Sequence, residues 1–85
     1  MQKIVVEIPL DHYDRFIDQC DEASPCYTIL KNGIIVRRPK ADHFERVVEI
    51  ECSVEKAKLL LDKAKRAYRQ ALPYIEKALA PARGP

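Results

Sequence analysis

The sequence predicts an α+β fold, a two-layer sandwich with helices on one face of a mostly antiparallel four-stranded sheet. Three observations predict it. Residues 3–8 alternate in polarity like a strand, strand-like segments flank Asn32-Gly33, and apolar residues recur with helical spacing from 54 to 79. The expected order of elements is β-α-β-β-β-α, and a long C-terminal helix completes the chain.

The first two expected elements are a strand and a short helix. The apolar residues of segment 3–8 fall on one face, and Pro9 ends the run because it cannot donate a hydrogen bond to a sheet. Residues 10–20 then carry apolar side chains at helical spacing. This helix is expected to stop before residues 21–25, since a residue that precedes proline disfavours the helical conformation.

Residues 27–38 are the expected hairpin, and residues 43–52 are the next extended run. Asn32-Gly33 is a favoured two-residue turn between antiparallel strands, in which both positions need a positive φ. That turn fixes the register and places Leu30 opposite Ile35 on the outer face of the sheet. Four strands are therefore expected in all.

Residues 54–79 are expected to form one long helix, with Ser53 as its N-cap. A helix of this length would span about 39 Å, whereas a strand of six residues covers about 20 Å. Pro73 removes one helical hydrogen bond. Because the apolar spacing continues through Pro73, we expect a kink there rather than a helix end near Gln70 followed by a second helix.

The second half of the long helix extends past any sheet that the chain can build, so its apolar stripe is expected to need a partner. A chain of 85 residues buries only a modest core, and self-association is a common supplement at this size. The expected partner is a second copy of the chain. The residues assigned to this homodimer interface are Tyr68, Leu72, Ile75 and Leu79.

The expected topology is similar to the ferredoxin-like arrangement, with a strand in place of the second crossover helix. This likeness is one of architecture, and it assigns no function. The chain length fits a single domain over residues 1–80, followed by a flexible tail over residues 81–85.

Composition narrows the function classes. No apolar run approaches the length of a membrane span, and the N-terminal sequence has no signal-peptide pattern. Three cysteines, an odd number, fit a reducing compartment better than a disulfide framework. A cytoplasmic location without membrane contact is therefore expected.

No cofactor, metal site or catalytic residue is assigned. A metal set would have to combine His12, Cys20, Cys26 and His43, but five residues separate the two cysteines, which is outside the usual zinc spacing. Cys26 is the only candidate nucleophile in an expected loop, and nothing in the sequence brings a base to it. An enzyme with its site at the dimer interface is the third functional interpretation.

Basic residues are the best functional lead, although the net charge is only +2. A protein that neutralises phosphates gains affinity by releasing counterions, but rings for base stacking are few, with Phe44 and Tyr74 as the candidates. A small homodimeric binding module is the first expectation, and a nucleic-acid or other polyanion-binding protein is the alternative. The residues assigned to polyanion binding are Arg37, Arg38, Lys40, Lys58, Lys65, Arg66 and Arg69.

Overall fold

The computed structural model describes residues 2–83 and confirms the α+β class. In chain order the elements are β1 (Lys3–Pro9), α1 (Leu10–Asp18), α2 (Pro25–Lys31), β2 (Ile34–Lys40), β3 (His43–Ser53), α3 (Val54–Ala67), the 3₁₀ helix η1 (Arg69–Ala71) and α4 (Leu72–Arg83). Ser53 caps α3 as expected, because its hydroxyl accepts a hydrogen bond from the Lys56 amide at 3.2 Å.

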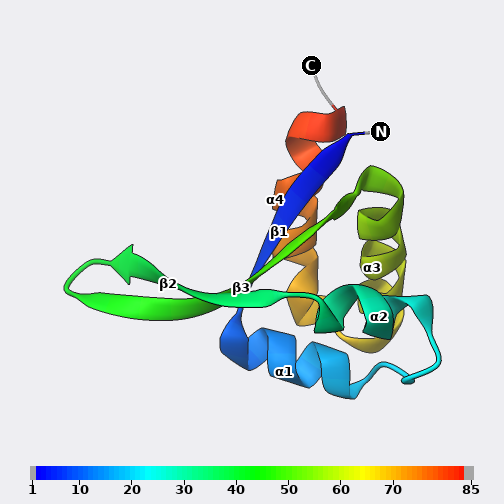
Figure 1. Ribbon diagram of the computed structural model, residues 1–85, viewed down its shortest axis with the longest axis horizontal. Helices are drawn as coiled ribbons and strands as arrows, with labels where there is room; N and C mark the ends of the chain where they lie inside the picture. Colours follow the sequence, from blue (N-terminus) through cyan, green and yellow to red (C-terminus); the bar gives the residue numbers. More distant parts are fainter. Residues whose placement is uncertain (1, 84–85) are drawn as a thin grey trace.

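The sheet is antiparallel, with β3 between β1 and β2 (Figure 1). The helices pack on the face that carries Val6, Val48 and Ile50, all of which are buried. On the other face Val5 is 46% exposed, whereas Val47 is buried. Within residues 2–83 the sheet has three strands, so the expected four-stranded, ferredoxin-like topology is not found.

The fourth expected strand, over residues 27–31, is the helix α2. The Ser24 hydroxyl accepts a hydrogen bond from the Tyr27 amide at 3.3 Å, and Pro25 occupies the first turn, where no amide donor is needed. This N-terminus starts a helix whose apolar side chains recur every three or four residues and enter the core. The buried residues of α2 are Cys26, Ile29 and Leu30.

The hairpin of the sheet joins β2 to β3 through Ala41-Asp42, not through Asn32-Gly33. Lys40 pairs with His43 across this loop, and Ala41 has a left-handed φ of 53°. Gly33 lacks the expected positive φ, and its amide donates to the carbonyl oxygen of Leu30 at 3.0 Å. Leu30 is consequently a core residue instead of an outer-face residue.

The expected long helix is divided in two. Tyr68, with φ −155° and ψ 83°, ends α3, and after η1 the helix α4 returns beside α3 (Figure 1). Pro73 lies in the first turn of α4, where its missing amide costs little. The expected kink is wrong, and the alternative of a helix end near Gln70 is close to the structure.

The return of α4 covers the apolar stripe that was expected to need a partner. Ile75 and Leu79 are 0% exposed in the single chain, because α4 packs against β1 and α3. Residues 81–83 of the expected tail belong to α4, and residues 84–85 lie outside the described residues. None of the helices within residues 2–83 is long and apolar enough to cross a membrane.

Candidate nucleic-acid interface

The loop end of the β2–β3 hairpin projects beyond the helices, and we call hairpin residues 34–46 the arm (Figure 1). Ile34, Ile35 and Phe44 are exposed on it. Ile34 and Ile35 lie on opposite faces at the base of the arm, whereas Phe44 lies near its loop, so these residues do not form one apolar patch. The two faces of the arm differ in charge, and this difference indicates which of them is suited to a ligand.

The outer face of the arm is neutralised within the chain. The Arg38 guanidinium pairs with Glu7 at 2.9 Å and also with Glu49, and the Lys40 ammonium lies 3.2 Å from the Glu45 carboxylate. Arg38 and Lys40 were both assigned to polyanion binding from the sequence. Their acidic partners offset the charge that they would offer to a phosphate.

The opposite face of the arm carries two arginines, Arg37 and Arg46. Arg37 and Arg46 stand directly opposite each other in the β2–β3 register, and both are exposed. Among residues 2–83, no ion pair includes either of them. Like charges directly opposite on a sheet repel each other. The pair is therefore an unneutralised positive site that an anion would stabilise.

Phe44 completes this surface, and we call Arg37, Phe44 and Arg46 the arginine face. The guanidinium carbon of Arg37 lies 4.6 Å from the centre of the Phe44 ring, a cation–π contact that orients the arginine. The Phe44 side chain is still 59% exposed. A ring beside two cations supplies both contacts that single-stranded nucleic acid uses, which are base stacking and phosphate pairing.

The other basic residues assigned from the sequence lie away from the arm. Lys58, Lys65 and Arg66 are exposed on α3, Arg69 is exposed on η1, and the arm points away from both elements (Figure 1). Arg69 donates to the carbonyl oxygen of Lys65 at 3.2 Å. Cations near a helix C-terminus are stabilised by the helix dipole, so Lys65, Arg66 and Arg69 have a structural role without any ligand.

The residues assigned to a dimer interface serve the interior of one chain. Ile75 and Leu79 are enclosed, whereas Tyr68 and Leu72 are half-buried. The Tyr68 hydroxyl oxygen lies 2.7 Å from Nδ1 of His12, which ties the end of α3 to α1. An uncovered stripe on α4 was the reason to expect dimerisation through that helix, and the structure removes this reason.

The groups considered for metal or nucleophilic chemistry are dispersed or buried. In the part of the chain that the structure describes, no three His, Cys, Asp or Glu side chains could hold a metal ion together. The Cys26 thiol is buried and donates to the carbonyl oxygen of Leu59 at 3.5 Å. Burial raises the pKa of the Cys20, Cys26 and Cys52 thiols, so each is protonated at neutral pH.

The three thiols are expected to react with iodoacetamide more slowly in the native chain at pH 8 than in denaturant, because only the thiolate is nucleophilic and burial raises the pKa of each thiol. Mass spectrometry of samples quenched at successive times measures the alkylation rate of each thiol. Rapid native alkylation of Cys26 would contradict its burial.

The thiols also make the free energy of unfolding depend on pH, because folding raises their pKa values. Their contribution to stability is complete below the ordinary thiol pKa and is lost as the pH rises through the raised values.

Arg37 and Phe44 were identifiable from the sequence, but Arg46 was not. The expected turn at Asn32-Gly33 placed Arg37 opposite Thr28, so the arginine pair was invisible. A two-residue loop at Ala41-Asp42 pairs Arg37 with Arg46 directly. The sequence did contain a signal for the correct register, which is Ser24-Pro25, a typical start of a helix. A helix at this point removes residues 27–31 from the sheet and excludes a hairpin turn at Asn32-Gly33.

In comparisons with known proteins, no family model, curated protein or solved structure matches this chain. The functional proposals therefore rest on the residues of this chain alone.

Proposed function

We propose that this chain is a small binding module whose arm binds single-stranded nucleic acid through the arginine face. The observation that carries the proposal is the pair of Arg37 and Arg46, directly opposite each other, without a carboxylate partner among residues 2–83 and beside exposed Phe44. A phosphate between the two guanidinium groups would neutralise their repulsion. Arginine suits this task because its planar fork binds phosphate oxygens bidentately.

The exposed ring favours a single strand over a duplex. Bases in a duplex are already stacked, whereas a single strand can place an unpaired base on an aromatic side chain. Phe44 keeps most of its side chain open to solvent while Arg37 covers part of it. A duplex would use only the two cations, and its binding is expected to be weaker than that of a single strand.

Replacing Arg37 and Arg46 together by glutamine is expected to weaken binding and to flatten its salt dependence. For single strands the slope of log affinity against log salt is about −0.7 per phosphate neutralised, so the double variant, which loses the phosphate held between the two guanidinium groups, should lose about 0.7 of slope. Phe44→Ala should cost about 1–3 kcal/mol of binding while the slope stays unchanged. Fluorescence anisotropy with short labelled DNA and RNA at several salt concentrations measures both effects.

The matched control replaces Lys65, Arg66 and Arg69 by glutamine, which removes at least as much positive charge far from the arm. This triple variant should bind like the wild type. Loss of binding in the triple variant alone would place the site on α3 and η1, and no wild-type binding at low salt would end the proposal.

A single Arg46→Gln change should raise stability by about 0.2–1 kcal/mol, because it relieves the repulsion with Arg37.

A homodimeric interaction module, the first expectation from the sequence, is the second candidate function. It is supported by the edge of β1 and not by α4. Within residues 2–83 no strand neighbours the outer side of β1, and Val5 on its outward face is exposed. An uncovered strand edge is a common site for pairing with another chain.

A further inference from the structure

The two edges of the sheet differ in how they are protected from pairing. β2 carries Pro39, which has no amide donor, among the charged residues Arg37, Arg38 and Lys40, and such residues block edge pairing. The only proline of β1 is its last residue, Pro9. In residues 2–83, β1 makes backbone pairs with β3 alone. The outer side of β1 therefore presents unpaired amide and carbonyl groups.

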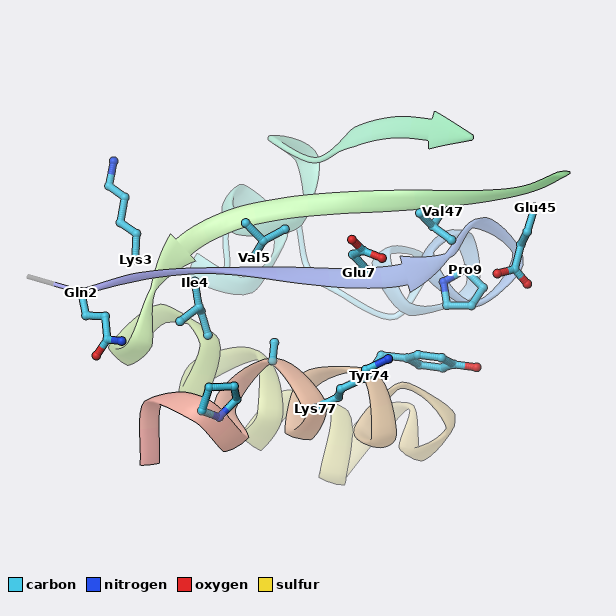
Figure 2. Close-up of a pocket in the computed structure, with 12 residues that line it drawn as sticks. Gln2, Lys3, Ile4, Val5, Glu7, Pro9, Glu45, Val47, Tyr74 and Lys77 are labelled. Carbon is cyan, nitrogen blue, oxygen red and sulfur yellow. The ribbon is translucent and has the colours of Figure 1, made fainter. Parts of the chain in front are cut away.

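An open groove of ≈ 640 Å³ runs along this edge between β1 and α4 (Figure 2). Its lining extends from Gln2 to Pro9, so its length matches that of β1. The residues that line it on the α4 side are Tyr74, Lys77, Ala78 and Pro81. The groove leaves the free edge of β1 accessible along its length to a second extended segment.

The outward face of β1 has an unmatched charge of each sign. Lys3 has no ion pair within residues 2–83. Glu7 stands directly opposite Glu49 in the β1–β3 register, and these two carboxylates share one cation, Arg38. One end of the strand therefore has a surplus cation, and the other end has a surplus carboxylate.

Only one antiparallel register of β1 with a second β1 matches these charges. A slip of one residue would turn inner side chains to the outer face, so inner residues must oppose inner residues. Centring the pair on Val5 sets Lys3 opposite Glu7 of the second copy, twice by symmetry. Centring it on Lys3 or on Glu7 opposes like charges, and centring it on Ile4 or Val6 separates Lys3 from Glu7.

We propose that two copies of the chain pair through β1, with a two-fold axis at Val5, into one continuous six-stranded antiparallel sheet. Each copy contributes its three strands, and the helices of both copies lie on the same face. The interface is isologous, because the same strand of each copy meets itself. This inference names the interface of the homodimeric module and rests on that second function, whereas nucleic-acid binding by the arm is independent of it.

Charge reversal tests this register by sedimentation equilibrium. The wild type is expected at twice the chain mass of 9.8 kDa. Lys3→Glu and Glu7→Lys should each be monomeric, an equimolar mixture of the two variants should restore a dimer, and the double variant should dimerise with itself. A monomeric wild type would reject the homodimeric function together with this interface. Dimeric single variants, or a mixture that stays monomeric, would reject the interface alone.

A second variant does not depend on Glu7, whose loss also removes a partner of Arg38. Val5→Cys places a thiol on the two-fold axis, where opposite Cβ atoms are about 4.5–5.5 Å apart. Mild oxidation should cross-link this variant into a covalent dimer. Lys3→Cys is the control, because the register keeps its two copies four residues apart, and the wild type controls for the native buried cysteines. Cross-linking through residue 3 and not residue 5 would overturn the proposed register.

Discussion

Ile75→Glu is expected to unfold the chain, because it places a carboxylate where neither water nor a cation reaches it. Ile75 is 0% exposed between α4 and its neighbours β1 and α3. Losing a buried isoleucine side chain costs about 2–5 kcal/mol, and burying an unpaired charge adds several more. Domains of this kind have about 5–15 kcal/mol of stability in total. Far-ultraviolet circular dichroism and urea titration measure the loss.

Leu59→Glu is the matched control for this change. Leu59 is a large apolar residue that is 47% exposed on α3, and a glutamate there would precede Lys63 by four residues, a favourable helical spacing. The control should melt close to the wild type. A folded, monomeric Ile75→Glu chain beside a dimeric wild type would show instead that α4 is a partner-binding helix and not a part of the core.

The elements that local sequence determines were predictable. Residues 3–8 form most of β1, residues 10–18 form α1, and residues 43–52 lie in β3. In each case the spacing of the apolar residues agrees with the residues that start or end the element, such as Pro9 and Ser53. The α+β class and the antiparallel sheet follow from these elements.

The two errors arose where local signals conflicted. Residues 27–30 include β-branched and aromatic residues typical of strands, yet Ser24-Pro25 starts a helix whose burial outweighs that preference. The apolar spacing continues through residues 68–73, although the backbone breaks at Tyr68. Periodicity records which side chains are buried, and it does not record that the chain reverses direction to bury them against β1.

The arginine face is formed by the β2–β3 register, and the incorrect hairpin turn expected at Asn32-Gly33 kept it from being predicted. The basic side chain of Arg37 is evident from the sequence. Its role in the proposed binding site, however, depends on Arg46, which lies directly opposite it in the β2–β3 register. The same dependence holds at the edge of β1. The charges of Lys3 and Glu7 are visible in the sequence, whereas the strand order that puts β1 at the edge of the sheet is known only from the structure.

Gly33→Ala is expected to destabilise the chain by about 1–3 kcal/mol through overpacking, and Gly33→Val by more. A Cβ at this position would clash with Cγ1 of Val48 and lie 3.1 Å from Cγ1 of Ile50, both of which are stiff, buried side chains. The cause is crowding, because Gly33 has no positive φ.

Truncating Val48 to alanine removes the clashing methyl group, so Gly33→Ala should cost less in that background than in the wild type. Urea titrations of the double-mutant cycle measure this coupling. Equal costs in the two backgrounds would show that backbone conformation, and not the contact with Val48, requires glycine at this position.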